Sequence, residues 1–380
     1  MSLELLNYHL RMLRDPIRIA AWKQAIASTI RPGDIVADIG TGAGLLALLA
    51  CEAGASRVFA IEESDMIEAA REIAGQSPFR DRITFFRGSS SRFQAPELAD
   101  VVMGDLLGVF GVTGGIAGAF ADARKRLLKP GGALLPASVE MFAAPVELPE
   151  WYRTQIDGWR EAVQGYGRCR ERAVNQMHLL EVNRDSILGI PASLGRLQLA
   201  EAPESPWRGK GETAIEREGV MHGIAGWCRC EYAPGILATN SPLEDRRTVW
   251  RHAVFPVERA VAIRPGDVVS AEISYDNPHR CSVLQWTVRV VSGGALREQF
   301  RHSTFNGELL SPERIRAARL GHKPPTRSRD RAARKVLDLC DGQHTLAEIQ
   351  AQLLREFPDQ FESAGSASDF VRGMLEVSGQ

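Results

Sequence analysis

The chain has 380 residues, of which 44% are hydrophobic, and its formal net charge is -1. This near balance of charges excludes the strongly basic surface with which proteins bind nucleic acid or anionic membranes. No apolar run approaches the ~18 residues that are needed to span a bilayer, and the length predicts two or three domains.

The N-terminus and the cysteines indicate a reduced, cytoplasmic protein. The first residues lack the basic and then apolar order of a signal peptide. The six cysteines are scattered, with no CxxC and no Cys/His metal spacing. We therefore expect no structural metal, and we expect Cys228 and Cys230 to share one face of a strand.

Two short helices are predicted over residues 3–30. The break between them falls at Asp15-Pro16, because Asp is a favoured N-cap and Pro a favoured first helical residue. Arg18 then lies in the first turn of the second helix. Taken alone, Arg18 would be interpreted as a solvated surface charge.

Residues 34–63 contain a glycine turn between two predicted strands. A strand from Ile35 to Ile39 enters the turn Gly40–Gly44, a helix begins at Leu45, and the strand from Arg57 to Ile61 ends at Glu62. Glycines allow a tight turn close to a ligand, and an acid about twenty residues further on can accept hydrogen bonds from a ribose diol. The pattern predicts a nucleoside cofactor. The alternative is that the glycines serve only helix–strand packing.

Alternating strands and helices continue to residue 136 and predict a parallel sheet with helices on both faces. The expected elements are a helix over 66–74, a strand over 83–87, a turn over 88–91, a strand over 99–103, a helix over 116–128 and a strand over 133–135. Ligands of such sheets bind at the carboxyl ends of the strands. The residues expected to gather there are Gly40–Gly44, Glu62, Ser89–Ser91 and Asp105.

The pattern changes after Pro136. Period-two runs over 223–232, 248–254, 268–275 and 282–290 predict an antiparallel sheet or barrel. Residues 150–190 are predicted to be partly helical and to form an arm or insertion.

The last part of the chain begins with the basic stretch 311–335, which is interpreted as a linker or an exposed helix. A helix ending at Cys340, the turn Asp341-Gly342, a helix over 346–357 capped by Thr345 and a helix over 368–377 then predict a small helical or winged-helix module.

Residues 5–305 resemble a protein arginine methyltransferase in several spaced motifs. These are His9-x-x-Met12-Leu13-x-Asp15-x-x-Arg18, Asp38-Ile39-Gly40-Thr41-Gly42-Ala43-Gly44, Glu62, the turn Ser89–Ser91, and Pro136 at the join to the family's β-barrel. The resemblance implies a Rossmann-like domain over 1–136, a β-barrel substrate domain over 137–310, and S-adenosylmethionine as the cofactor. It also implies that Arg18 binds the cofactor carboxylate, Glu62 the ribose and Ser89–Ser91 the adenine, although Ser91 stands where the family has an acid. The expected cofactor-binding residues are Met12, Arg18, Asp38, Gly40, Gly42, Gly44, Leu45, Glu62, Glu63, Ser89, Ser90 and Asp105.

The chain departs from this family where the substrate guanidinium would bind. Asp105 replaces the first glutamate of the family's clamp, Gly114 replaces the second, and Val249 stands where a histidine pairs with the acid at the position of Asp15. A guanidinium that leaves water needs paired carboxylates, so ordinary arginine methylation is not expected. The apolar residues of this stretch suggest a neutral or weakly basic acceptor instead, and an amide, imidazole, amine or thiol would each serve. These apolar residues are Leu106, Leu107, Val109 and Phe110. The catalytic candidates are Asp105, which would accept a hydrogen bond or proton, His252 as a second base, and Trp250 as a pocket wall. The alternatives are a structural role in the turn for Asp105 and simple packing on a strand for His252.

Residues 330–380 resemble the PqqD-like domains that hold leader peptides of ribosomally made natural products. The resemblance lies in Val336-Leu337-x-Leu339-Cys340-Asp341-Gly342-x-x-Thr345-Leu346-x-x-Ile349. It implies a precursor peptide as partner, bound as an added strand, with residues 311–329 as a basic linker.

We therefore expect an S-adenosylmethionine-dependent methyltransferase that modifies a precursor peptide, on nitrogen. The alternatives are a protein arginine methyltransferase with a rearranged acid pair, a non-catalytic cofactor- or peptide-binding scaffold, and a small-molecule methyltransferase. Relatives of the core dimerise through an arm of the barrel domain, and residues 150–190 are the candidate for such an arm.

Overall fold

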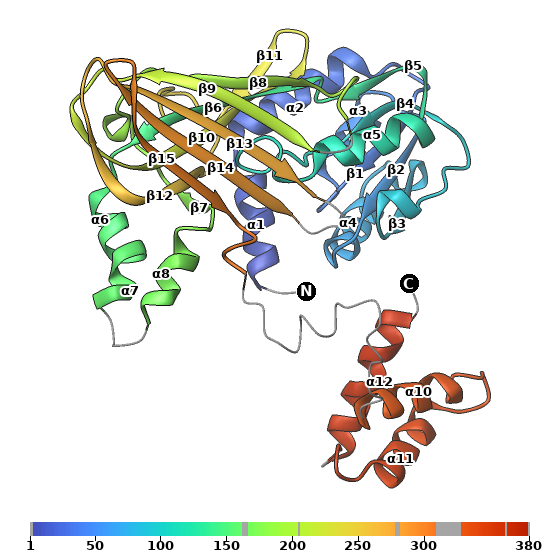
Figure 1. Cartoon of the computed structure of the whole chain (residues 1–380). Helices are drawn as coiled ribbons and strands as arrows, with labels where there is room; N and C mark the ends of the chain where they lie inside the picture. The colour runs from blue at the N-terminus through green and yellow to red at the C-terminus, as the bar shows by residue number, and fades with distance from the viewer. Residues whose placement is uncertain are drawn as a thin grey trace. The chain divides into compact units, whose positions relative to one another are not determined.

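The computed structural model describes residues 3–161, 166–203, 206–277, 282–308, 328–361 and 363–378. The chain divides into two compact units, Met1–Glu308 and Leu309–Gln380. Each unit is described by itself below (Figure 1).

The first part of unit 1 is a five-stranded parallel sheet in the order β3-β2-β1-β4-β5. Its strands are β1 (Ile35–Ile39), β2 (Arg57–Glu62), β3 (Ile83–Arg87), β4 (Ala99–Met103) and β5 (Leu128–Leu135). The expected Rossmann-like parallel sheet is thus present. β5 begins earlier than predicted, because Leu128 already pairs with Ala99 and the glycine-containing segment after it forms an irregularity in the ladder.

The helices around this sheet are α1 (Leu3–Leu13), α2 (Pro16–Thr29), α3 (Leu45–Glu52), α4 (Met66–Gly75) and α5 (Ile116–Arg126), with the short 3₁₀ turns η1 (Arg80–Arg82) and η2 (Ser90–Arg92). The predicted break between α1 and α2 is confirmed. Asp15 caps α2 by accepting hydrogen bonds from the backbone N–H groups of Ile17 and Arg18.

The second part of unit 1 consists of two antiparallel sheets. One is six-stranded, in the order β7-β12-β10-β6-β8 with β11 paired to β10, and the other is four-stranded, in the order β15-β14-β13-β9. The strands are β6 (Ser138–Val146), β7 (His178–Leu180), β8 (Ala192–Gln198), β9 (Trp207–Ala214), β10 (Gly219–Ala233), β11 (Ile236–Thr239), β12 (His252–Ile263), β13 (Val268–Asp276), β14 (Val283–Ser292) and β15 (Ala295–Ser303). The predicted antiparallel arrangement is confirmed, and one hydrophobic core runs from the parallel sheet into these sheets.

The segment after β6 is partly helical, as predicted. It contains α6 (Pro149–Trp151), the π-helical turn η3 (Tyr152–Asp157), α7 (Gly158–Glu161) and α8 (Gly167–Ala173), and the turn η4 (Arg184–Ser186) follows β7. The buried side chain of Arg170 on α8 donates to Asp157 Oδ1 at 2.7 Å and to the carbonyl oxygen of Glu258 on β12 at 2.6 Å. These bonds fix the helical segment to the six-stranded sheet.

The described residues of unit 2 form the helices α10 (Ser328–Leu339), α11 (Leu346–Glu356) and α12 (Ala364–Ser378) around a small core that includes Val336, Ile349 and Leu353. The predicted cap of α11 is confirmed, since Thr345 and Glu348 form a reciprocal capping box. α12 begins four residues before the predicted Ser368, because Ser363 Oγ accepts from the Ser366 N–H in the manner of an N-cap. Between 328 and 378, leaving aside the undescribed position 362, no strand of a wing is found. The predicted basic linker lies almost entirely outside the described residues.

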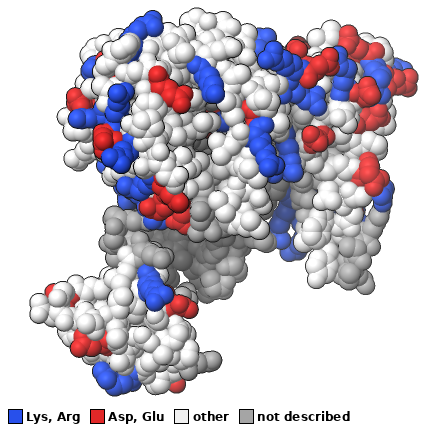
Figure 2. Space-filling view, turned by 180° about the vertical axis from the view of Figure 1, so that it is seen from behind, with Lys and Arg blue, Asp and Glu red and all other residues white. Residues whose placement is uncertain are grey.

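Within the described part of the chain, no helix has the length and hydropathy of a membrane span. On the face of the molecule seen in Figure 2, acidic and basic side chains are interspersed rather than separated by sign. This distribution agrees with the net charge of -1.

Candidate functional site

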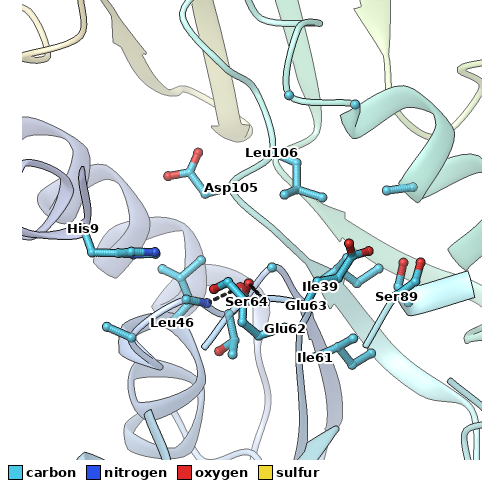
Figure 3. Close-up of a pocket in the computed structure, with 18 of the residues that line it drawn as sticks. His9, Ile39, Leu46, Ile61, Glu62, Glu63, Ser64, Ser89, Asp105 and Leu106 are labelled. Atoms are coloured by element: carbon cyan, nitrogen blue, oxygen red, sulfur yellow. Dashed lines mark hydrogen bonds between the residues drawn. The ribbon is translucent and has the colours of Figure 1, made fainter. Parts of the chain in front are cut away.

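A cavity of about 680 Å³ opens at the carboxyl ends of β1 to β4. Figure 3 shows His9 and Asp105 on one side of it, Ser89 on the other, and Glu62 and Glu63 between them. This volume lies in the range of small-molecule and cofactor pockets.

The glycine turn after β1 has backbone geometry that other residues rarely adopt. Gly40 and Gly42 have φ angles of +72° and +54°. A Cβ at Gly40 would lie 2.7 Å from Leu106 Cδ2, and one at Gly42 would lie 2.6 Å from His9 Cε1. Both glycines therefore allow neighbouring segments to close around the cavity.

Two predicted cofactor residues of this segment, Gly44 and Asp38, do not line the cavity. A Cβ at Gly44 would lie 3.2 Å from Ala70 Cβ, so this glycine allows α3 to pack closely against α4. For Gly44, a packing role therefore fits better than contact with a cofactor. Asp38 is fully buried and accepts a 2.5 Å hydrogen bond from Thr41 Oγ1. Burial raises the pKa of its carboxyl group to about 7. Asp38 therefore stabilises the glycine turn through Thr41 without lining the cavity.

Glu62 at the end of β2 is oriented by backbone donors on both oxygens. Oε2 accepts from the Gly42 N–H at 2.9 Å, and Oε1 accepts from the Ser64 N–H at 2.8 Å. The carboxylate still lines the cavity, beside Glu63. Since each carboxylate oxygen can accept more than one hydrogen bond, Glu62 fits the ribose-binding role that the sequence predicts.

Arg18 and Asp105 form a buried ion pair at the other side of the cavity. The Arg18 Nε–Asp105 Oδ2 bond joins side chains that are only 8% and 7% exposed, and Trp22 Nε1 donates to the same oxygen at 3.4 Å. Burial lowers the pKa of the Arg18 guanidinium, but Asp105 outweighs this effect and the pKa is raised overall. The interpretation of Arg18 as a solvated surface charge is therefore wrong.

The other two catalytic candidates lie away from the cavity lining. His252 is buried, its Nδ1 accepts from the Val182 N–H at 3.0 Å, and its Nε2 lies 2.7 Å from the carbonyl oxygen of Asn240. Both ring nitrogens are thus used in holding β12 to its neighbours. Trp250 is partly buried and places Nε1 3.3 Å from Met12 Sδ, so it supports the cavity wall from behind. Of the three candidates, only Asp105 reaches the cavity.

The loop after β4 was expected to give the acceptor site an apolar lining, and only Leu106 does so. Leu107 and Phe110 are fully buried in the core, where the Phe110 ring meets those of Trp207 and Phe255 edge-on. Gly114 closes the loop, since a Cβ there would lie 2.3 Å from the Leu106 carbonyl oxygen. Position 114 therefore has no room for an acidic side chain.

The backbone of Val249 makes the contact with Asp15 that the resemblance assigns to a histidine side chain. Its N–H donates to Asp15 Oδ2 at 3.0 Å, while Oδ1 of the same carboxylate caps α2. The Val249 side chain itself is 56% exposed. Asp15 thus connects the start of α2 to the segment before β12 without a histidine.

The cavity lining also contains residues that the sequence analysis missed. Leu5 and His9 share one face of α1 with Met12, at helical spacing that could have identified them. Tyr8 also lies on α1, next to His9, whereas no local pattern identifies the remaining residues, which come from α5 and from the end of β13. The missed residues include Leu5, Tyr8, His9, Gly118, Ala119, Asp122 and Asn277.

Over the described parts of both units, no group of three or more His, Cys, Asp or Glu side chains could hold a metal ion. The predicted pair Cys228 and Cys230 is buried in β10. Burial raises the pKa of both thiols, that of Cys228 to about 12.

Two family models match successive parts of the chain. Residues 23–136 match the ribosomal protein L11 methyltransferase family (PrmA), and residues 137–289 match the arginine methyltransferase oligomerization subdomain. The probable protein arginine N-methyltransferase 6 of Arabidopsis thaliana is 31% identical over 289 residues, which cover 71% of this chain and 65% of the relative. Protein arginine N-methyltransferase 6 of Xenopus tropicalis is 24% identical over 77% of this chain and 90% of its own length.

Solved structures show the same fold. The Trypanosoma brucei PRMT1 enzyme–prozyme heterotetrameric complex with AdoHcy matches 78% of this chain and 98% of its own with a TM-score of 0.68 at 21% identity. Arabidopsis thaliana protein arginine methyltransferase 10 matches 79% and 98% with a TM-score of 0.70, also at 21% identity. Unit 1 therefore has the fold of these protein arginine methyltransferases, and the comparisons support a methyltransferase enzyme with S-adenosylmethionine as its cofactor.

Proposed function

We propose that the chain transfers a methyl group from S-adenosylmethionine to an uncharged side-chain nitrogen of a peptide. The observation that carries this proposal is the buried Arg18–Asp105 pair, which lines the same cavity as the glycine turn and Glu62. The cofactor supplies an already activated methyl group on its sulfonium, so the protein has to position the acceptor and stabilise its reacting form.

The lining residues fit the parts of this cofactor. Arg18 provides a positive charge for the carboxylate, Glu62 accepts from the ribose diol, and Ser89 and Ser90 face the base. Both contacts of Asp105 with described residues fall on Oδ2, which leaves Oδ1 to accept a hydrogen bond from the acceptor nitrogen. The remaining residues proposed to contact the cofactor are Met12, Gly40, Gly42, Leu45 and Glu63.

The acceptor is proposed to be neutral because the described loop after β4 supplies one carboxylate, Asp105, and not the pair that a guanidinium needs. Asp105 is already paired with the guanidinium that also serves the cofactor carboxylate, and position 114 cannot hold a second acid. A cationic side chain moved from water into this site would lack compensation, which costs several kcal/mol. An amide or imidazole nitrogen does not carry this penalty.

We further propose that the substrate is a ribosomally made precursor peptide whose leader is bound by residues 330–380. This proposal rests on the motif around Asp341-Gly342 and on the capped helix α11 that follows it. Unit 2 also exposes Leu337 and Leu346, which are 48% and 52% accessible. Since its described residues form helices, the leader would bind between helices rather than as an added strand. Tethering would raise the local substrate concentration to about the mM range.

Arginine methylation is the second candidate, and the names of the curated relatives favour it. It would require an acid set that differs from the paired glutamates of the family.

The test supplies the full-length protein with methyl-labelled S-adenosylmethionine and extract of the source organism, and maps the label by mass spectrometry. We expect label on one small peptide, at a residue other than arginine. Replacing both exposed leucines (Leu337→Lys with Leu346→Lys) should remove the label, whereas Asp330→Asn on the exposed end of α10 should not. Label on arginines of many proteins, unchanged in the double variant, would favour the second candidate.

A further inference from the structure

The end of the cavity opposite Arg18 is built from two segments, which we call the base end. Figure 3 shows Ser89, one of its members, across Glu62 and Glu63 from His9 and Asp105. The base end consists of Gly88, Ser89, Ser90 and Ser91 from the turn after β3, and Gly118, Ala119 and Asp122 from α5.

Under the proposed function, on which this inference rests, the ribose diol lies at Glu62 and the carboxylate of the cofactor at Arg18. The base then extends from Glu62 away from Arg18, toward Ser89–Ser91. The polar groups of the base end therefore face the edge of the purine.

Hydroxyl groups dominate this edge. The Oγ atoms of Ser89 and Ser91 lie 2.9 Å apart, and either can be the donor. A hydroxyl can donate or accept, whereas an ionised carboxylate only accepts. The turn can thus reverse the direction of its hydrogen bonds without moving its backbone.

The carboxylate of Asp122 is oriented by Arg126 rather than toward a ligand. Arg126 Nε donates to Asp122 Oδ1 at 2.7 Å, and Arg126 Nη2 bonds Oδ2. The same guanidinium donates to the carbonyl oxygens of Ser90 at 2.7 Å and Phe93 at 2.9 Å. Asp122 and Arg126 therefore hold the turn in place. Glu63, which follows the ribose-binding Glu62, is the other acid near the base end.

We propose that Ser89–Ser91 recognise position 6 of the purine through hydroxyl groups, so that the site binds a 6-oxo purine about as well as a 6-amino purine. Adenine presents an amino donor at this position and hypoxanthine a carbonyl acceptor. A fixed carboxylate would reject the carbonyl, while a serine hydroxyl rotates to donate to it. Ser91 is the residue that determines this specificity.

The test measures the Kd of the full-length protein for S-adenosylhomocysteine and S-inosylhomocysteine by calorimetry. We expect the two values to agree within about tenfold in the wild-type protein. Ser91→Asp should raise the preference for the adenosine form by at least about tenfold, because a carboxylate facing a carbonyl leaves both unpaired. Ser91→Ala, the matched control that adds no acid, should leave the ratio of the two Kd values near that of the wild type.

A wild-type preference for the adenosine form above about tenfold, or a ratio unchanged by Ser91→Asp, would overturn the inference while leaving the proposed cofactor intact. A ratio that responds to Glu63→Gln and not to Ser91→Asp would assign recognition of the base to Glu63 and would also overturn it. If neither compound binds, the proposed function fails, and this inference fails with it.

Discussion

At the scale of single residues, the proposed function gives the carboxylate of Asp105 two tasks. Oδ2 pairs with the buried Arg18, and Oδ1 is proposed to accept a hydrogen bond from the acceptor. The family's clamp uses two acids where this site has one. The residue that replaces the first glutamate therefore affects folding and chemistry together.

Asp105→Asn should lower the free energy of unfolding by about 3 kcal/mol, because it leaves Arg18 as a buried charge without its partner. It should also abolish methyl transfer. Urea denaturation measures the first effect. The control is Asp81→Asn, which disrupts an exposed pair with Arg80 and should cost under about 1 kcal/mol. Equal stability of the two variants would show that the buried pair contributes nothing.

Gly42→Ala should weaken the binding of S-adenosylhomocysteine by displacing the His9 ring from the cavity. Gly131→Ala is a matched control, since Gly131 also has a positive φ, of +79°, but has nothing within 4 Å of its Cβ position. Both variants should lose about 1–2 kcal/mol of stability through backbone strain. Calorimetry should show weaker binding for Gly42→Ala alone, and the added substitution His9→Ala should partly restore it.

At the scale of elements, the ends of helices depend on residues that are neighbours in sequence, whereas contacts between strands depend on residues far apart in sequence. The Asp15-Pro16 break and the Thr345 cap were predicted because the side chain and the backbone groups it binds are neighbours in sequence. The roles of His252 and of the loop after β4 were not predicted, because the groups they contact are distant in sequence. His252 is held by Asn240 and Val182, and nothing in the aperiodic loop distinguishes Leu106, which faces the cavity, from Leu107, which enters the core.

Thr345→Ala should remove one half of the capping box of α11 and destabilise unit 2 by about 1 kcal/mol. Thr345→Ser keeps the hydroxyl and should retain the stability of the wild type. Circular dichroism during thermal unfolding measures the difference. Identical melting of the alanine and serine variants would contradict the role of the cap.

The pair of strands β14 and β15 should respond to acid through His302. This ring stacks on Trp286 with centroids 5.3 Å apart, and burial lowers its pKa to about 4 from an ordinary value of 6.5. Between pH 6.5 and 4 the unfolded chain binds the proton more readily, so the free energy of unfolding falls as the pH falls. His302→Phe should make this fall shallower in urea titrations at several pH values. An unchanged slope would exclude His302 as a contributor.

At the scale of the whole molecule, the hydrophobic core of unit 2 shares no residue with the clusters of unit 1 among those described. In unit 1, the alternation of strands and helices predicted the parallel sheet, and the glycine turn with the acid after β2 predicted a nucleoside cofactor. The resemblance to arginine methyltransferases was needed to specify S-adenosylmethionine, because the spacing of these residues does not distinguish it from a dinucleotide. Unit 2 is short and its pattern is common to many helical modules. Its fold could be predicted only as helical, and its partner rests on one motif.

Heating should reveal separate unfolding transitions for the two units. Val336→Ala, in the core of unit 2, should lower the free energy of unfolding of that unit alone by about 2 kcal/mol, and with it the midpoint temperature of its transition. Val288→Ala, fully buried in β14, should lower only the transition of unit 1. Scanning calorimetry measures both. One transition that moves with either substitution would show that the units unfold together.

The tight closure of the loop at Gly114 also restricts how this protein can evolve. A descendant that gained an acid at position 114 by one codon change would carry a side chain that collides with the Leu106 carbonyl group. The loop would first have to change its backbone path, by substitutions that bring no benefit until the acid is present. Under the proposed function, lineages that share this glycine should therefore diversify among acceptors other than arginine.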